Sequence, residues 1–82
     1  MYYRAERDNR KFANIKYARK AAIDSLATET AIYEGNMVGE WKIGIVKKVS
    51  GVPYYMTKNG TWRLSKSGDA KKVKDVPAPF GL

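Results

Sequence analysis

The segment YYMTKNGTWRL, residues 54–64, constrains the fold more than any other part of the sequence. Its Asn59-Gly60 pair separates two β-prone runs and favours a tight two-residue hairpin, because both turn positions need positive φ. The predicted register pairs Lys58 with Thr61 and Tyr55 with Leu64. We expect one face of this hairpin to join the core (Tyr55, Thr57, Trp62 and Leu64) and the other to point outward (Tyr54, Met56, Lys58, Arg63 and Ser65).

A helix is predicted from about Asn14 to Ala27. Asn14 is a suitable N-cap, and the alanines of this segment are strong helix formers. With about 100° of rotation per residue, one side of the helix is an apolar stripe and therefore the expected core face. The stripe comprises Ile15, Ala18, Ala22, Ile23 and Leu26, joined by Phe12 if the helix begins earlier.

Extended segments separated by turn residues are predicted on both sides of the helix. The first is Tyr2 to Arg7, followed by the turn pair Asp8-Asn9. After the helix come Thr30 to Glu34 with the turn pair Gly35-Asn36, and then Met37 to Val49, which ends at the turn pair Ser50-Gly51. Within the last segment Trp41, Ile43 and Ile45 alternate with polar or small residues, the phase changes at Val46, and Gly44 is a suitable bulge residue.

The predicted fold class is α+β: a strand, a helix and an antiparallel meander (β-α-β-β-β-β), with one helix packed on a small antiparallel sheet. Residues 1–68 form the expected single domain, and residues 69–82 a flexible basic and Pro-rich tail. Phe80 and Leu82 in this tail either dock on the body or another subunit or lie in a disordered end. A chain of 82 residues buries a modest core, so a homo-oligomer is expected.

The composition argues against an enzyme. The sequence has no cysteine and no histidine, which removes disulfides, thiolate nucleophiles and the usual zinc ligands, and no catalytic or cofactor-binding motif is present. We therefore expect no catalytic residues, no metal and no cofactor. A paired-carboxylate hydrolase or magnesium site built from Asp24, Glu29, Glu34 and Glu40 is the alternative, although nothing forces two of these acids into one pocket. No apolar run spans a bilayer, so a soluble, cytoplasmic protein without a membrane partner is expected.

The charge is strongly positive and segregated. Sixteen basic and eight acidic residues give +8. Residues 1–20 contribute +5, residues 21–40 contribute −4 and residues 41–66 contribute +6. This polarity suits an anionic partner, a nucleotide or nucleic acid, on one face of the protein. Simple solubility is the alternative explanation.

The start of the helix carries cations where acids are usually favoured. Arg10 and Lys11 precede it, and Lys16, Arg19 and Lys20 lie in its first half. Because a helix N-terminus is itself positive, converging Lys and Arg side chains make it favourable for phosphate, and we expect an anion near Arg10, Lys11 and Lys16. The alternative is that these side chains extend into water.

Arg19 interrupts the apolar stripe of the helix. Either the sheet leaves it at the edge of a cleft or subunit contact, or its stem packs while its guanidinium reaches an acid such as Glu34 or Glu40.

Aromatic residues alternate with cations at several positions. Tyr17 lies beside Lys20 on the helix, and Tyr33, Tyr54, Met56 and Arg63 point outward in the predicted register. Rings for stacking and cations for phosphate are what proteins use to bind single strands or free nucleotides. Packing or oligomerisation is the alternative role for these aromatic residues.

The element order, with an Ala-rich helix (KYARKAAI), then YEG and a Lys/Gly-rich meander, resembles small accessory proteins of bacteriophages and prophages. The resemblance covers roughly residues 1–66 and transfers no site residue. It implies a binding protein acting on nucleic acid or on host defence components, as anti-CRISPR proteins and nucleotide-sequestering proteins do, in the bacterial host cytoplasm. Mimicry of nucleic acid is the least favoured option because the chain is basic.

The expected function is therefore non-enzymatic binding of a phosphate-bearing ligand. In one version the ligand is the nucleic-acid backbone, and in another an oligomer sequesters a small nucleotide immune signal. A protein inhibitor of a host defence complex is the third possibility. The candidate binding residues are Arg10, Lys11, Lys16, Tyr17, Arg19, Lys20, Tyr54 and Arg63.

Overall fold

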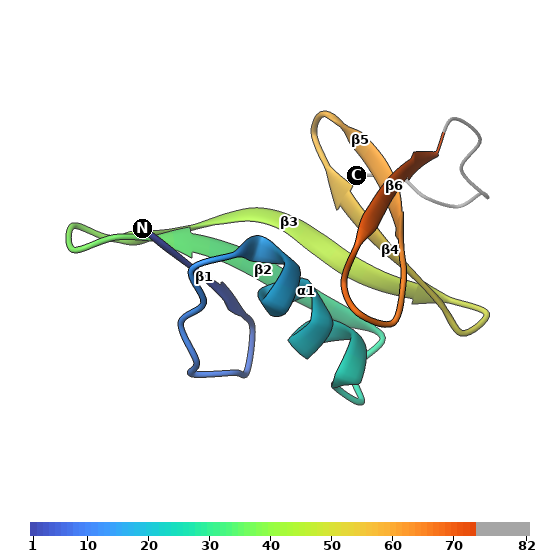
Figure 1. Cartoon of the computed structure of the whole chain (residues 1–82), viewed down its shortest axis with the longest axis horizontal. Helices are drawn as coiled ribbons and strands as arrows, with labels where there is room; N and C mark the ends of the chain where they lie inside the picture. Colours follow the sequence, from blue (N-terminus) through green and yellow to red (C-terminus); the bar gives the residue numbers. More distant parts are fainter. Residues whose placement is uncertain (74–82) are drawn as a thin grey trace.

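A computed structural model describes residues 1–73 of the protein. It contains one helix and one antiparallel sheet of six strands, arranged in the order in which they occur in the chain (Figure 1). The elements are β1 (Tyr2–Ala5), α1 (Ile15–Asp24), β2 (Glu29–Gly35), β3 (Glu40–Val49), β4 (Val52–Thr57), β5 (Gly60–Leu64) and β6 (Ala70–Val73). The predicted α+β class, with one helix packed on an antiparallel meander, is confirmed.

The sixth strand corrects the prediction of a flexible tail from residue 69. Ala70 to Val73 pair with β5, from Leu64 opposite Ala70 to Thr61 opposite Val73. The sequence AKKV has no useful periodicity, and its pairing with β5 depends on a neighbour that is already in place. The two lysines suit an edge strand, because charge discourages pairing with a further chain. The proposed docking of Phe80 and Leu82 lies outside the described residues.

Helix α1 begins as predicted and ends earlier. The Asn14 side chain accepts a hydrogen bond from the Lys16 backbone N–H at 2.9 Å, which caps the first turn. The helix ends at Asp24, and the backbone N–H of Ser25 closes its last turn. Leu26 is 102% exposed rather than part of the core, because it lies beyond the helix end and no longer follows the helical stripe. Ala18 and Ala22 do point into the core, where both are fully buried.

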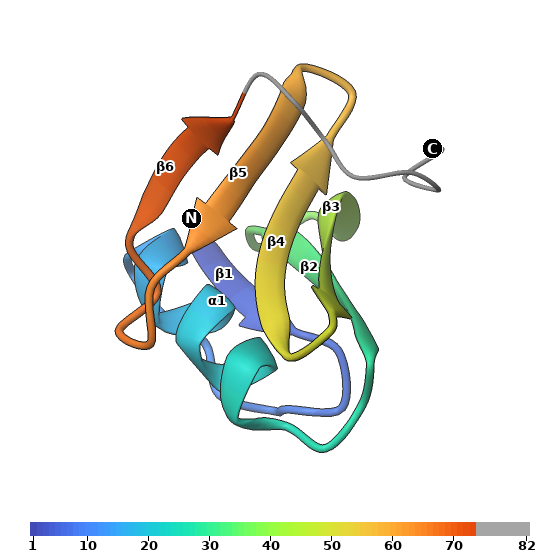
Figure 2. The ribbon, with the colours of Figure 1, turned by 90° about the vertical axis from the view of Figure 1, so that its right-hand side faces the viewer.

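Strand β3 bends next to Gly44. The pairing of β2 with β3 is regular from Glu29 to Ile32, which lies opposite Gly44, and then shifts so that Tyr33 lies opposite Lys42. Ile43 is therefore the extra residue of a bulge, and the phase of the strand changes there rather than at Val46. The part of β3 on the N-terminal side of the bulge pairs with β2 alone. Strands β4–β6 turn away from β1–β2 (Figures 1 and 2).

The β4–β5 hairpin has a different register from the predicted one. Thr57 lies opposite Gly60 and Tyr55 opposite Trp62, so Lys58 and Asn59 form the turn. The backbone of Asn59 does not adopt the positive φ that the predicted turn requires, whereas Gly60 has φ 143°. The tight turn with two positive φ values lies instead at Ser50 (51°) and Gly51 (80°), between Val49 and Val52.

The faces of this hairpin survive the change of register, because the partners move by two residues and side chains alternate with a period of two. Tyr55 and Leu64 are buried on the helix side as predicted. Met56 is on the outer face but only 3% exposed, which corrects its predicted exposure. It lies between Ile45 and Thr61 in neighbouring strands, within an apolar row on that face.

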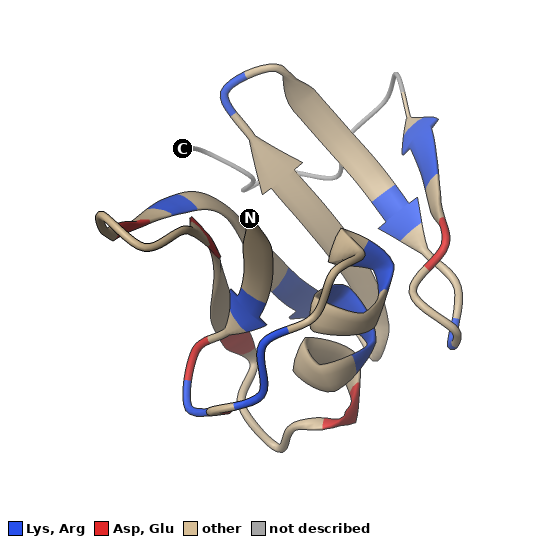
Figure 3. Ribbon diagram, turned by 60° about the vertical axis from the view of Figure 1, so that its left-hand side comes forward, with Lys and Arg blue, Asp and Glu red and all other residues tan. Residues whose placement is uncertain are grey.

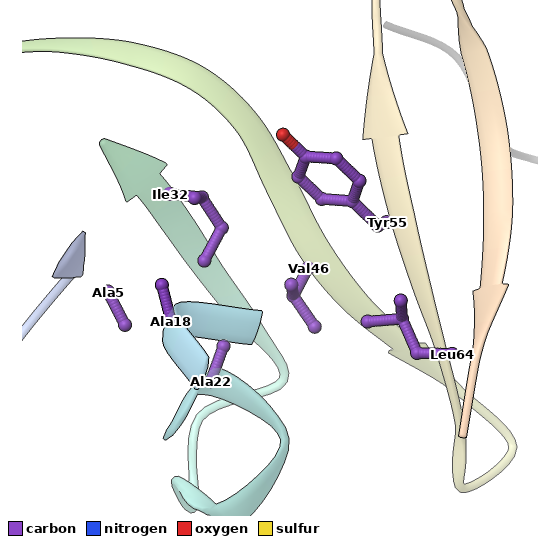
Figure 4. Packing of buried hydrophobic residues seen from close by; sticks show 7 residues of the cluster. All are labelled: Ala5, Ala18, Ala22, Ile32, Val46, Tyr55 and Leu64. Carbon is purple, nitrogen blue, oxygen red and sulfur yellow. The ribbon is translucent and has the colours of Figure 1, made fainter. Parts of the chain in front are cut away.

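The core fills the space between the bent sheet and α1 (Figure 4). It comprises Ala5, Ala18, Ala22, Ile32, Val46, Tyr55 and Leu64. The small alanines of α1 allow the helix to approach the sheet closely, while Tyr55 extends from β4 toward Ile32 and Val46. Its ring lies over Gly44, where an added Cβ would come within 2.5 Å of a ring carbon. The bend of β3 and the position of Tyr55 therefore depend on each other.

The β5–β6 loop is fastened to the helix. Gly68, with φ 95°, is buried against the helix backbone, and a Cβ there would lie 2.3 Å from the Lys16 carbonyl oxygen. Arg19 Nε donates a hydrogen bond to the Gly68 carbonyl at 2.9 Å, and Lys16 Nζ lies 3.3 Å from an Asp69 carboxylate oxygen. These contacts hold the C-terminal strands against the N-terminal part of the fold.

Replacing Gly68 with alanine is expected to lower the free energy of unfolding by about 2 kcal/mol or more. The cost combines a left-handed backbone at a residue with a Cβ and a collision with helix backbone that cannot move aside easily. Gly39→Ala is the matched control, since nothing lies within 4 Å of its Cβ position. Urea unfolding measures both variants, and equal stabilities would contradict the tight contact between loop and helix.

Glu40 joins β3 to β1 across the intervening strand. Arg4 Nη2 lies 2.7 Å from Glu40 Oε1, and the Tyr2 hydroxyl donates to Oε2 at 2.9 Å. These hydrogen bonds, chiefly those of Arg4, lower the pKa of Glu40 from its ordinary 4.5 to about 2. Because the pKa is lower in the folded state, the stabilisation is present above about pH 4.5 and is lost as the pH falls toward 2.

Glu40→Gln is therefore expected to be less stable than the parent protein at neutral pH, with the difference shrinking to nothing as the pH approaches 2. Thermal unfolding across this pH range measures the effect. Arg4→Gln should reproduce the pH dependence, and the double variant should add little, because both changes break the same pair. A difference that persists unchanged at low pH would contradict the assignment.

Candidate ligand-binding cleft

A cleft of about 760 Å³ opens where β3 and β4 separate. The two strands pair from Val49 opposite Val52 only as far as Ile45 opposite Met56. Beyond that point the first half of β3 continues with β2, and the end of β4 continues with β5. The cleft is lined by Glu34, Trp41, Lys42, Ile43, Gly44, Ile45, Tyr55, Met56, Thr57, Lys58, Asn59 and Trp62. Its volume lies within the range of about 300–1,000 Å³ that is typical of ligand pockets.

Three aromatic side chains line the cleft. Trp41 is 42% exposed, and the rings of Tyr55 and Trp62 lie with their centroids 6.0 Å apart and tilted by 41°. Lys72 Nζ lies 5.7 Å from the centre of the Trp62 ring, and Arg19 Cζ lies 5.5 Å from that of Tyr55. Cations at this distance interact favourably with ring faces. The cleft thus offers flat apolar surfaces beside positive charge.

Tyr55 is the most deeply buried of these rings, with 6% of its surface exposed. Burial raises the pKa of its phenol, the Arg19 charge opposes that rise, and the Glu34 carboxylate adds to it. Burial, the field of Glu34 and a hydrogen bond to that carboxylate, in this order, also raise the pKa of Tyr3. Both hydroxyls therefore stay protonated at neutral pH, and the Glu34 carboxylate lies close to both rings.

The positive charge of the described protein is concentrated in residues 41–73, which supply every cleft residue except Glu34. Residues 1–40 hold seven basic and six acidic side chains, a net charge of +1, whereas residues 41–73 hold eight basic and one acidic, a net charge of +7. In Figure 3 the acids of the N-terminal half lie among its cations, while β4–β6 and their loops are positive apart from Asp69. Lys42 and Lys58 of the cleft form no ion pair with any residue among 1–73.

The cations predicted to gather at the helix start have partners within the protein. Arg10 pairs with Asp8 at 2.7 Å, and Lys20 pairs with Asp24 at 2.8 Å, while Lys16 is engaged by the β5–β6 loop. Lys11 Nζ lies 4.9 Å from the centre of the Tyr2 ring. The structure thus surrounds the helix start with internal pairs rather than with several side chains directed at one point.

Two further predicted residues of the helix differ from each other in their surroundings. Tyr17 is 51% exposed, as expected, and its ring lies 6.2 Å from that of Phe12. Arg19 is partly buried, and it contacts the Gly68 carbonyl and the Tyr55 ring rather than Glu34 or Glu40. The prediction that Arg19 pairs with Glu34 or Glu40 is wrong, because its guanidinium is hydrogen-bonded to the carbonyl of Gly68 in the β5–β6 loop. Arg19 lies behind a ring of the cleft without lining the cleft itself.

Tyr54 and Arg63 lie opposite each other on the outer face of the sheet, away from α1. Lys47 and Lys71 extend the same cross-strand row on either side. The structure therefore separates the predicted residues into a helix group and an outer-face pair. Neither group lines the cleft.

Five residues of the cleft are not among the binding residues predicted from the sequence: Trp41, Lys42, Tyr55, Lys58 and Trp62. Tyr55 and Trp62 were expected in the core, and the sequence does not show that the helix leaves their side of the sheet partly uncovered. The signal that exists is Gly44, the predicted bulge residue, which lies next to the bulge at Ile43, because a bulge in a long strand marks a place where neighbouring strands separate.

Neither a metal site nor a membrane helix is found in the part of the chain that the structure describes. Residues 1–73 contain no group of three or more Asp or Glu side chains placed to hold a metal ion. Their single helix is not long and apolar enough to cross a membrane.

Comparison of the chain with models of protein families, with curated proteins and with solved structures finds no match. The function is therefore inferred from the chemistry of the chain's own residues.

Proposed function

We propose that this protein is a non-enzymatic binding protein for single-stranded nucleic acid, with bases held in the cleft between β3 and β4–β5. The observation that carries the proposal is the combination of three cleft aromatics, Trp41, Tyr55 and Trp62, with two lysines that have no ion pair within residues 1–73. The phage-type accessory role implied by the sequence resemblance is part of the same proposal.

The aromatic rings favour unstacked bases over a duplex. Proteins that bind single strands stack bases on exposed aromatic side chains, each stack contributing about 1–3 kcal/mol. A base inside a duplex already stacks on its neighbours and offers only its edges. Trp41, which lines the cleft, has the exposure needed to receive a base, with 42% of its surface open.

The distribution of charge favours a polymer over a free nucleotide. Lys42 and Lys58 line the cleft, and Lys72 lies over the ring of Trp62 beside it. Arg63 of β5 and Lys71 of β6 lie on the outer face of the same strands, where a nucleic-acid strand that leaves the cleft and passes around the edge strand β6 would reach them. A single nucleotide would use only the nearest of these, whereas successive phosphates of a strand would engage the extended positive surface.

Trp41→Ala is expected to weaken binding of a labelled single strand of about 10 nucleotides by roughly tenfold, the value of one lost base stack. Fluorescence anisotropy at low salt measures the dissociation constant. The matched control is Tyr17→Ala, which removes a ring of similar exposure that lies outside the cleft and should leave binding unchanged. If both variants bind like the parent, or if no single strand binds at low salt, bases do not occupy the cleft.

Salt dependence gives a second test, directed at the phosphates. Binding by the parent protein should weaken by orders of magnitude between about 50 and 200 mM salt. Lys42→Gln combined with Lys58→Gln should reduce the slope of log K against log salt by about 1.4, since each phosphate contact to a single strand contributes about 0.7.

The double variant Lys16→Gln and Lys20→Gln removes the same charge from cations that already pair with Asp69 and Asp24, so its slope should stay near that of the parent. Equal slopes for both double variants would show that the cleft lysines do not contact phosphate. Native mass spectrometry of the purified protein distinguishes the version with a free nucleotide, because an oligomer retaining a small nucleotide would contradict the polymer proposal.

A further inference from the structure

Glu34 is the one carboxylate among residues 1–73 that forms no ion pair. The other six acids of this region each lie within 4.0 Å of a Lys or Arg nitrogen. Glu34 is partly buried, lines the cleft, and lies in a cross-strand row between Tyr3 of β1 and Trp41 of β3. Its donor within the protein is the Tyr3 hydroxyl, because a hydrogen bond to Glu34 is among the causes that raise the pKa of Tyr3. An ionised carboxylate accepts several hydrogen bonds, so the lone pairs that Tyr3 leaves are available to a ligand in the cleft.

A carboxylate beside stacking rings discriminates among bases by their hydrogen-bonding edges. An ionised carboxylate only accepts hydrogen bonds. On its Watson–Crick edge guanine presents two adjacent donors, N1–H and the N2 amino group, which match the two carboxylate oxygens. Adenine and cytosine place an acceptor nitrogen beside their amino donor, and uracil or thymine flanks one donor with two carbonyl acceptors. Only guanine therefore pairs with Glu34 without bringing an acceptor against it.

We infer that Glu34 makes the cleft selective for guanine, accepting the N1–H and N2–H donors of a base stacked on Trp41, the exposed ring opposite Glu34 in the neighbouring strand. This inference rests on the proposed single-strand binding. The remaining polar groups of the cleft complement the same base, because the amide of Asn59 and the ammonium groups of Lys42 and Lys58 are donors suited to the guanine O6 acceptor.

The same rings and carboxylate also resemble the kind of site that binds a quaternary ammonium group. Charge argues against such a ligand here. Lys42 and Lys58 line the cleft, and the faces of Trp62 and Tyr55 already carry Lys72 and Arg19. A permanently charged cation would be repelled by these groups, whereas a neutral base within an anionic strand would be attracted.

The inference is tested with labelled thymine-only strands of about 10 nucleotides and with the same strands carrying one central guanine. The guanine strand should bind about tenfold more tightly, the discrimination expected of one bidentate contact. Replacing the guanine with hypoxanthine, which lacks the N2 amino group, should lose part of this gain. Replacing it with 7-deazaguanine, which changes only the opposite edge, should keep the gain.

Glu34→Gln should abolish the preference for guanine while binding the thymine-only strand at least as tightly as the parent, because a negative charge has left the cleft. Glu29→Gln makes the same change of charge at an acid outside the cleft that pairs with Lys47, and it should keep the preference.

Single-strand binding without a guanine preference, or a preference that survives Glu34→Gln, would overturn this inference and leave the proposed function standing. If neither strand binds and a trimethyl-lysine peptide does, the guanine selectivity and the proposed single-strand binding are both wrong.

Discussion

The packing of Tyr55 over Gly44 is the contact on which the rest of the structure depends. Because Gly44 has no side chain, the ring can lie directly on the β3 backbone, where any Cβ would collide with it. From that position Tyr55 packs with Val46 and Ile32 in the core, receives the Arg19 guanidinium, and forms one wall of the cleft. The same ring thus completes the hydrophobic interior and shapes the surface that we propose binds bases.

Local patterns in the sequence predict much of the fold. The Asn14 cap, the alanines facing the core and the turns at Gly35-Asn36 and Ser50-Gly51 follow from the preferences of a few neighbouring residues. The β4–β5 register and the strand β6 do not, because they depend on distant neighbours. The local turn preference of Asn59-Gly60 is overridden by the pairing that places Tyr55 opposite Trp62. The segment AKKV forms a strand because β5 offers it an edge to pair with.

The cleft is harder to predict from the sequence than the fold. Its residues come from separate strands and are brought together only where β3 bends at Ile43 and parts from β4. The sequence identifies the cations of the helix correctly as unusual but does not show their partners: Asp8 and Asp24 lie close in the chain, while Asp69 arrives with the β5–β6 loop. Charge along a chain therefore does not show which cations the fold pairs internally.

The agreement between strand order and chain order has a consequence for how the protein folds. Each strand from β2 to β5 pairs with the next one along the chain, so those pairings close short loops and require little search. The pairing of β1 with β2, in which Tyr2 meets Gly35 across the helix, closes a much longer loop. Topologies with mostly local contacts fold rapidly. We therefore expect the meander from β2 onward to assemble first and α1 and β1 to dock on it afterwards.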